Sequence, residues 1–193
     1  SVEGAGRTAP SKRKDARRNK EALLDAAAAV FVRSGVDAPV RDIAAEAGVG
    51  LGTIYRHFPT RADLIVAVYR HQVEALAEAG PALLADSASP HAALGRWIDL
   101  FVDFLVTKHG LAAALRSDEA GFETLHAYFL DRLVPVCAGI LDAAVAAGEV
   151  RPGLDALQLM RGVGNLCIGA ENDSRYDARP LVALLVAGMR QAG

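Results

Sequence analysis

The stretch VRDIAAEAGVGLGTIYRHF at residues 40–58 decides the fold of this chain. Two short segments with helical patterning, about 39–47 and 51–57, are separated by a few residues that include Gly48. A glycine at that point lets the backbone turn sharply, and the small Ala44 lets two helices cross closely. The pattern predicts a helix-turn-helix, a unit that places its second helix in the major groove of DNA.

Helical patterning continues on both sides of this motif. A helix is expected over 15–34 with Gly35 as its stop, and a long helix over 61–84 begins with Thr60 and Asp63, which resemble a capping box. Further helices are expected over 89–110, 111–116, 118–147, 154–170 and 180–189. Pro135 lies inside one of them, where we expect a kink or a break. The sequence therefore predicts an all-α fold with about nine helices.

The composition supports a helical protein with an uneven distribution of charge. The 193 residues are 52% hydrophobic and 23% charged, alanine is abundant, and the strand-favouring threonine and isoleucine are scarce. Residues 1–70 contain 12 Lys and Arg against 8 Asp and Glu, whereas residues 71–193 contain 9 against 15. A basic N-terminal part followed by an acidic remainder is typical of a nucleic-acid-binding protein, although a solvated basic tail would give the same residue counts.

Several other classes of protein are disfavoured. The sequence contains no nucleophile elbow with a Ser-His-Asp order, no P-loop and no metal-ligand spacing, so we expect no enzyme activity, no cofactor and no metal site. Cys137 and Cys167 stand in apolar surroundings, which favours buried thiols in a reducing compartment over a redox switch. No apolar stretch is long enough to cross a bilayer, and the N-terminus lacks the apolar segment of a signal peptide. We therefore expect a cytoplasmic, nucleoid-associated protein without a membrane partner.

The motif GVGLGTIYRHF at 48–58, followed by TRADL at 60–64, closely resembles the signature of TetR-family transcriptional regulators. The resemblance is dense from about residue 17 to residue 73. It implies a three-helix N-terminal DNA-binding domain and a divergent helical C-terminal domain that binds a ligand and forms a homodimer. It also implies a repressor that a small apolar or amphipathic effector releases from an inverted-repeat operator in double-stranded DNA.

Two positions depart from the family pattern. Gly50 stands where the family often has Ser or Thr, and Pro39 stands where it often has Thr, so two hydroxyl groups that contact DNA in the family are missing. Arg41 and Arg61 can compensate electrostatically. The departures keep an alternative open, namely a ligandless or activating regulator, or a helical interaction module with weak specific DNA readout.

The expected domains follow from the motif and from the resemblance. Residues 1–14 form a basic, disordered arm, residues 15–70 the helix-turn-helix DNA-binding domain, and residues 71–193 the helical ligand-binding and dimerisation domain. The boundary near Arg70 falls inside the long helix.

The expected DNA contacts come from the start of the second motif helix and from cations around it. Thr53 can touch a thymine methyl group or a base edge, whereas Tyr55 and His57 suit phosphates. The residues expected to contact DNA are Arg17, Arg18, Lys20, Arg41, Gly50, Leu51, Gly52, Thr53, Tyr55, Arg56, His57 and Arg61. The phosphate contacts predict a binding affinity that falls steeply with salt concentration.

The last two expected helices are apolar on more than one face, which indicates cover from a second subunit. The resemblance implies a four-helix dimer interface, and burial within one subunit is the alternative. The residues expected at this interface are Met160, Val163, Gly164, Cys167, Leu181, Leu184, Leu185 and Met189.

An effector pocket is the least certain part of the interpretation, because aromatic stripes also form ordinary cores. Two helices each carry an aromatic face, and His126 could serve as a polar anchor between them. The residues expected to bind the effector are Trp97, Phe101, Phe104, Phe122, His126, Phe129, Arg161 and Asn165. Nothing in these residues identifies a compound.

Overall fold

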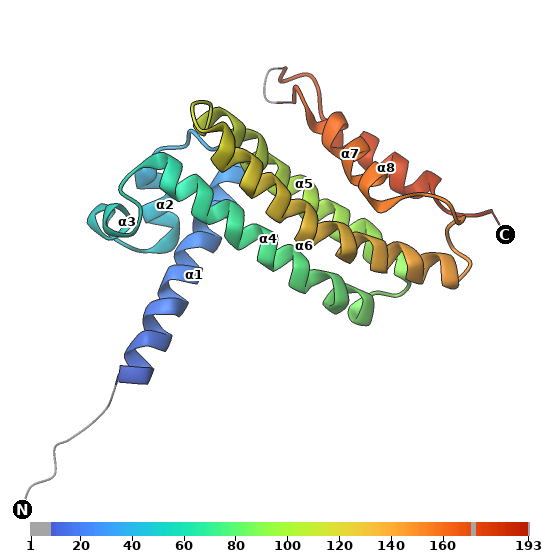
Figure 1. Cartoon of the computed structure of the whole chain (residues 1–193), viewed down its shortest axis with the longest axis horizontal. Coiled ribbons are helices and arrows are strands. Elements are labelled where there is room, and N and C mark those ends of the chain that lie inside the picture. The colour runs from blue at the N-terminus through green and yellow to red at the C-terminus, as the bar shows by residue number, and fades with distance from the viewer. Residues whose placement is uncertain (1–8, 171–172, 193) are drawn as a thin grey trace, which may run out of the picture.

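The computed structural model describes residues 9–170 and 173–192, which form eight α-helices and no strand (Figure 1). The helices are α1 (Ala9–Ser34), α2 (Val40–Ala47), α3 (Leu51–His57), α4 (Arg61–Asp86), α5 (Pro90–Ala114), α6 (Glu119–Ala146), α7 (Ala156–Cys167) and α8 (Ala178–Gly188). The expected all-α fold is confirmed, with one helix fewer in the described chain than the sequence suggested.

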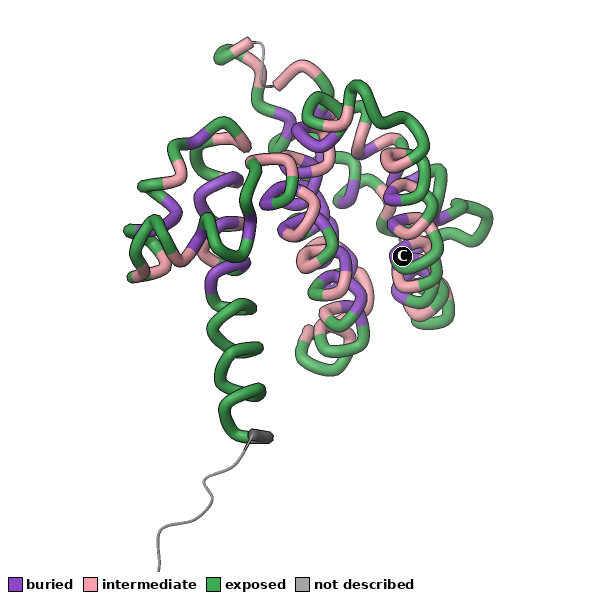
Figure 2. Tube along the Cα trace, turned by 60° about the vertical axis from the view of Figure 1, so that its left-hand side comes forward, coloured by how far each residue is buried: buried purple, intermediate pink, exposed green. Residues whose placement is uncertain are grey.

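The helices are arranged as a small N-terminal unit and a larger body. Helices α1, α2 and α3 pack together at one end, while α4, α5 and α6 pack side by side, and the pair of α7 and α8 lies against α5 and α6 (Figure 1). The first turns of α1 project away from the rest and are exposed (Figure 2). Helix α4 connects the two parts, because it contacts α1 as well as α5 and α6.

The helix ends are set by local signals that the sequence carries. Gly35, with φ of 81°, follows the last turn of α1 in the left-handed conformation that stops a helix. At the start of α4, the Thr60 side chain accepts a hydrogen bond from the Asp63 backbone N–H, and the Asp63 carboxylate accepts one from the Thr60 N–H. The expected capping box is therefore confirmed.

One buried apolar cluster runs through both parts of the molecule, from Leu23 in α1 to Val186 in α8. Its largest members are aromatic, and the polar atoms of Trp97 and Tyr69 are hydrogen-bonded. Trp97 Nε1 donates to the Leu76 carbonyl at 3.0 Å, and the Tyr69 hydroxyl donates to the Leu125 carbonyl at 2.9 Å. The N-terminal unit and the body are therefore packed on one continuous core.

Helix α1 begins earlier than expected. Residues 9–14, which the sequence assigned to a disordered arm, form its first turns, while residues 1–8 of that arm lie outside the described residues. The reason is local: Pro10 stands in the first turn, where its missing N–H costs nothing, and good helix formers follow it.

Two expected interruptions are absent from the structure. Helix α5 runs through Gly110 to Ala114, so the separate helices over 89–110 and 111–116 are one. Gly110 does not end the helix but allows close packing, because a Cβ atom at this position would lie 2.4 Å from a methyl group of Val36. Helix α6 likewise runs without a break through Pro135, which is exposed on its surface.

The cysteines and the helix lengths agree with the sequence interpretation. Within the described residues, Cys137 and Cys167 are free and buried, and burial raises the pKa of the Cys137 thiol to about 12. Such a thiol is a core group of low reactivity at neutral pH. None of the helices in residues 9–170 and 173–192 combines the length and apolarity needed to span a bilayer.

Candidate nucleic-acid interface and ligand pocket

Helices α2 and α3 cross with their inner faces buried. Ile43, Ala44 and Ile54 are between 0% and 6% exposed, and the turn between the helices is closed by a hydrogen bond from the Val49 N–H to the Ala44 carbonyl at 3.0 Å. Gly48 ends α2 with φ of 68°. The buried side fixes the crossing angle, so α3 is held rigidly with its other side free.

Gly48 and Gly52 should respond differently to substitution. Gly48→Ala places a Cβ atom in the left-handed region and should lower the free energy of unfolding by about 1 kcal/mol. Gly52→Ala is the matched control, because Gly52 lies inside α3 without a positive φ, and the nearest atom to an added Cβ is the flexible end of Arg56 at 4.0 Å. Urea unfolding of the two variants measures the difference, and equal losses of stability would contradict the assignment of the turn.

The outer face of α3 presents apolar and aromatic side chains to solvent. Leu51 is 45% exposed and Tyr55 is 50% exposed, although both are large and apolar enough to be buried elsewhere. Gly50 and Gly52, at the start of the same helix, leave the backbone uncovered. The N-terminus of α3 therefore carries little side-chain bulk, and the Leu51 and Tyr55 side chains beside it can reach into a DNA groove.

Thr53 and Arg56 are tied to each other on this face. The Arg56 Nε donates to the Gly52 carbonyl at 3.0 Å, and its Nη2 lies 3.4 Å from the Thr53 hydroxyl. Both hydrogen bonds are exposed, so they are weak and can be exchanged for contacts with a partner. His57 is exposed at the end of α3, beside Phe58.

Arg61 makes hydrogen bonds that the sequence did not suggest. Its Nη1 donates to the carbonyl oxygens of Val36 and Ala38, at 2.8 Å each, and the residue is half-buried. These hydrogen bonds hold the loop that leads from α1 into α2. Arg61 therefore positions the loop before the helix-turn-helix, and its contact with DNA stays a prediction.

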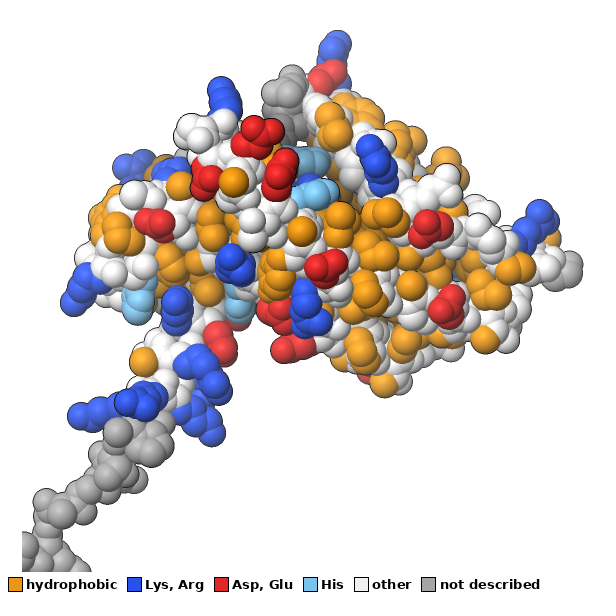
Figure 3. All heavy atoms as spheres, viewed as in Figure 1, with side chains coloured by type: hydrophobic (Ala, Val, Ile, Leu, Met, Phe, Trp, Pro, Cys, Tyr) orange, Lys and Arg blue, Asp and Glu red, His pale blue; other side chains and the backbone are white. Residues whose placement is uncertain are grey.

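The remaining candidate cations surround α3. Arg17, Arg18 and Lys20 are exposed on α1, where Lys and Arg side chains crowd the projecting turns (Figure 3). Lys20 also lies over the ring of Phe58, with Nζ 5.8 Å from its centroid. Arg41 is exposed in the first turn of α2, with its Nε 3.9 Å from Asp42. Pairs this exposed are weak, so the positive charge remains available.

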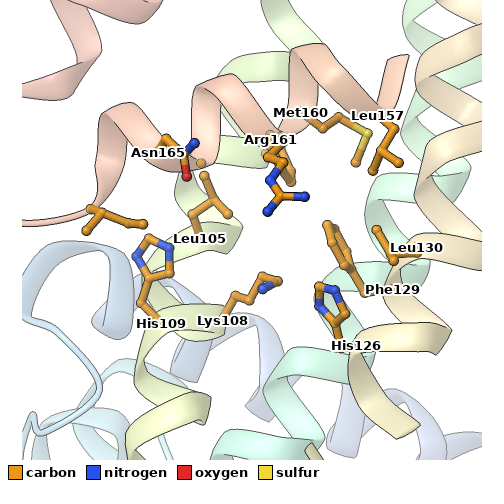
Figure 4. A pocket seen from close by; sticks show the side chains of 13 residues that line it. Leu105, Lys108, His109, His126, Phe129, Leu130, Leu157, Met160, Arg161 and Asn165 are labelled. Carbon is orange, nitrogen blue, oxygen red and sulfur yellow. The ribbon is translucent and has the colours of Figure 1, made fainter. Parts of the chain in front are cut away.

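A pocket of about 320 Å³ lies in the body, between α5, α6 and α7 (Figure 4). It is lined by Phe101, Leu105, Lys108, His109, His126, Phe129, Leu130, Leu157, Met160, Arg161, Gly164, Asn165 and Ile168. Its volume is at the lower end of the range of about 300–1,000 Å³ that is usual for small-molecule sites. The pocket is therefore large enough for a small ligand.

Five of the eight residues expected at a ligand site line this pocket, namely Phe101, His126, Phe129, Arg161 and Asn165. Two do not, because Trp97 is 0% and Phe104 is 1% exposed in the core. Phe122 stacks on His126 beside the pocket without lining it.

Lys108 and His109 were missed by the sequence interpretation, which followed the aromatic residues alone. The signal was present for Lys108, since positions 101, 105 and 108 lie on one face of a helix.

The pocket is polar on one side and positively charged. Burial lowers the pKa of Lys108, whose Nζ lies 5.3 Å from the centroid of the Phe129 ring. The pKa of His126 is lowered by burial and then by the nearby charges of Lys108 and Arg161. Both effects favour the neutral form of the His126 imidazole, which lines the same pocket as the two cations.

The C-terminal helices leave an apolar surface uncovered. On α8, Leu184 is 69% exposed, Leu181 42% and Leu185 38%. Ile168, just after α7, is 63% exposed. A helix with large apolar side chains this exposed is typical of a surface that another molecule covers.

Some residues expected at that surface are buried instead. Met160, Val163 and Cys167 are 2%, 0% and 8% exposed within their own subunit, so they cannot form a partner-facing surface. Gly164 lines the pocket, and Met189 is half-buried against the core. The expectation is corrected for Met160, Val163 and Cys167, because α7 turns them inward against α5 and α6. Gly164 and Met189 are only partly buried, so their place at the interface stays a prediction.

Two family models match the chain. The model described as "Bacterial regulatory proteins, tetR family" matches residues 23–68, and the one described as "Transcriptional regulator SbtR-like, C-terminal domain" matches residues 89–191. Among curated proteins, the chain is 26% identical over 181 residues to the fatty acid metabolism regulator protein of Bacillus subtilis, covering 86% of this chain and 93% of that protein.

Solved structures give the same result. A TetR transcriptional regulator from Streptomyces coelicolor is 35% identical and superposes with a TM-score of 0.73, covering 91% of this chain and 99% of that one. A TetR transcription regulatory protein from Mycobacterium vanbaalenii is 30% identical with a TM-score of 0.64, covering 93% and 99%. The similarity therefore extends through both parts of the molecule.

Proposed function

Given that the chain belongs to the TetR family and is thus a DNA-binding transcriptional regulator, we propose that it is a dimeric repressor that a small amphipathic effector releases from an inverted-repeat operator. One observation carries the DNA-binding part of this proposal: a helix-turn-helix with a fully buried inner face presents Leu51 and Tyr55 on its outer face. Large side chains that do not serve the fold are available to a partner.

The proposed DNA surface is built from three helices. Helix α3 enters the major groove with Gly50 first, and Thr53 reads base edges or thymine methyl groups once Arg56 releases it. Tyr55 and His57 bind phosphates, as do Arg41 on α2 and Arg17, Arg18 and Lys20 on α1. Because most of these contacts go to phosphates, they supply affinity more than sequence specificity.

The proposed domains meet within α4. Residues 15–70 bind DNA, and residues 71–193 bind the effector and the second subunit. The exposed leucines of α8 form the centre of the dimer interface, which places two α3 helices about one DNA turn apart. A regulator of this kind acts where the DNA is, so we propose that it is associated with the nucleoid.

The effector is proposed to bind in the pocket between α5, α6 and α7. The Bacillus subtilis relative is named as a regulator of fatty acid metabolism, which suggests an amphipathic ligand for this chain as well. The effector shifts the dimer toward a form whose α3 helices no longer match the operator, and its preference for that form sets the size of the response. The family consists of regulators rather than enzymes, and we propose no catalytic role for the pocket.

Arg41→Ala should weaken DNA binding. Loss of one phosphate contact in each protomer should lower the affinity by about tenfold or more and reduce the log–log salt slope by about 2. Fluorescence anisotropy on a duplex that the protein selects from a random pool, measured at several salt concentrations, gives both numbers. Arg96→Ala is the control, since Arg96 pairs with Asp86 where α4 ends and α5 begins, and it should leave both unchanged.

The same experiment separates the main proposal from its alternative. A helical interaction module without operator readout would bind DNA weakly and would respond equally to Arg41→Ala and Arg96→Ala. That result would leave the fold intact and would move the function of the chain to the exposed faces of α7 and α8.

A further inference from the structure

Three nitrogen-bearing side chains reach the pocket from three different helices. Lys108 comes from α5, His126 from α6 and Arg161 from α7, and Figure 4 shows Lys108 and Arg161 directed toward the space beside His126. All three line the same pocket, and both cations lower the pKa of His126. None of the described residues that line the pocket is acidic.

The two cations are without a counterion in the described part of the chain. Among the described residues, no ion pair includes Lys108 or Arg161, whereas Arg132, for comparison, pairs with Glu74 at 2.7 Å. Arg161 is exposed to solvent, so the missing partner matters most for Lys108. Lys108 is half-buried, and its contacts are the rings of Phe129 and Phe122. A partly buried cation without an anion is held at a cost, which an anion that enters the pocket would remove.

Much of the rest of the lining is apolar. It includes Phe101, Leu105, Phe129, Leu130, Leu157 and Met160. A ligand that fills the pocket must therefore combine a small negatively charged group with an apolar body. The modest volume favours a medium-length chain or a single ring system over a large multi-ring compound.

We infer that the pocket takes a small amphipathic anion, whose head group lies between Lys108 and Arg161 and whose apolar part lies on Phe101 and Met160. The inference rests on the proposed effector pocket and gives its ligand a chemical class. His126 and Asn165 add hydrogen bonds, and the His126 Nδ1 is a buried atom without a partner in the described chain. We take the head group to be a carboxylate or an equivalent small oxyanion, because its oxygens can accept hydrogen bonds from both the Lys108 ammonium and the Arg161 guanidinium.

The position of Lys108 also connects the ligand to the DNA-binding unit. Lys108 precedes Gly110 by two residues, and Gly110 packs directly against Val36 in the loop before α2. An anion that draws Lys108 toward Arg161 therefore acts on the end of α5 that supports this loop. The same end of α5 therefore links the charge in the pocket to the orientation of the helix-turn-helix.

Calorimetric titration of the full chain with four ten-carbon ligands that differ in their head groups tests the class. Decanoate should bind saturably, with one site per protomer, and decanol should bind at least about tenfold more weakly. Decyltrimethylammonium should not bind. Decyl sulfate distinguishes a requirement for a carboxylate from a requirement for any monoanion. Equal binding of decanol and decanoate, or a preference for the cation, would overturn the inference.

Charge-removing variants test the residues. Lys108→Met and Arg161→Met should each lower the affinity for decanoate by about tenfold or more and leave the affinity for decanol unchanged or higher. Lys108→Arg should retain the preference for the anion, and Arg96→Met is the surface control. Thermal unfolding checks that the variants fold, and Lys108→Met should not be less stable than the parent chain, because it removes a desolvated charge. An unchanged preference in both Met variants would contradict the assignment.

The titrations use no DNA, so their outcome is independent of the operator. A chain that selects an operator but does not prefer decanoate to decanol refutes the ligand class and leaves the regulator intact. A chain that prefers decanoate but selects no DNA site supports the ligand class and refutes the repressor.

Discussion

Leu184→Glu should break the proposed dimer into monomers and abolish the tight operator binding that we propose for it. Leu184 is 69% exposed, the most exposed large apolar side chain in the described part of α8. A carboxylate at the centre of an apolar interface loses its hydration without gaining a partner. Because two linked half-sites bind far more tightly than one, the affinity for an inverted repeat should fall by about 10²–10⁴-fold.

Sedimentation velocity and anisotropy measure these two effects. Ala183→Glu is the matched control: it adds the same charge at an exposed neighbouring position that carries no large apolar side chain, and it should remain a dimer. Leu184 is exposed in the subunit, so its substitution should not lower the stability of the monomer fold. A dimeric Leu184→Glu variant would show that subunits associate through another surface.

Gly110→Ala should destabilise the protein by forcing α5 away from the loop before α2. The added Cβ atom would lie 2.4 and 2.5 Å from the two γ-methyl groups of Val36 and 2.9 Å from its Cβ atom. Overpacking of this kind costs about 1–3 kcal/mol of the free energy of unfolding. Because the same contact joins the body to the DNA-binding unit, the response of DNA affinity to effector should fall as well.

A rescue and a control make this prediction specific. Val36→Ala removes both γ-methyl groups, so the double variant should recover part of the loss, and the cycle measures the coupling between the two residues. Gly139→Ala places the same substitution inside α6, where nothing lies within 4 Å, and should stabilise the helix by about 0.5–1 kcal/mol. Equal effects of Gly110→Ala and Gly139→Ala in urea unfolding would contradict the close contact.

The helix-turn-helix could be predicted from sequence because its signals are local. The turn at Gly48, the small Ala44 and the capping box at Thr60 all act within a few residues, and the structure places each as expected. The sequence could not show that Gly110 faces Val36, because the two residues are far apart in the chain and meet only in the folded state. In a sequence, a glycine can mark either the end of a helix or a place where two segments pack closely. Only the packing in the folded structure distinguishes these two roles.

The pocket and the dimer surface were harder to predict for a related reason. Apolar residues at helical spacing are the same whether they face a core, a ligand or a second subunit, so Trp97 was expected in the pocket and Met160 in the interface. Polar residues discriminate better. Lys108 and Arg161 are charged, and charged side chains are not expected to face an apolar core. Because both line the pocket, they indicate a function for it.

Selection from a pool of random duplex DNA, followed by binding at several salt concentrations, tests the central claim most directly. The account predicts enrichment of an inverted repeat with half-sites about one DNA turn apart, bound by a dimer with an affinity that falls steeply as salt rises. Enrichment of no sequence, with only weak and salt-sensitive binding, would contradict the account and would show that Gly50 and Pro39 leave α3 without specific readout.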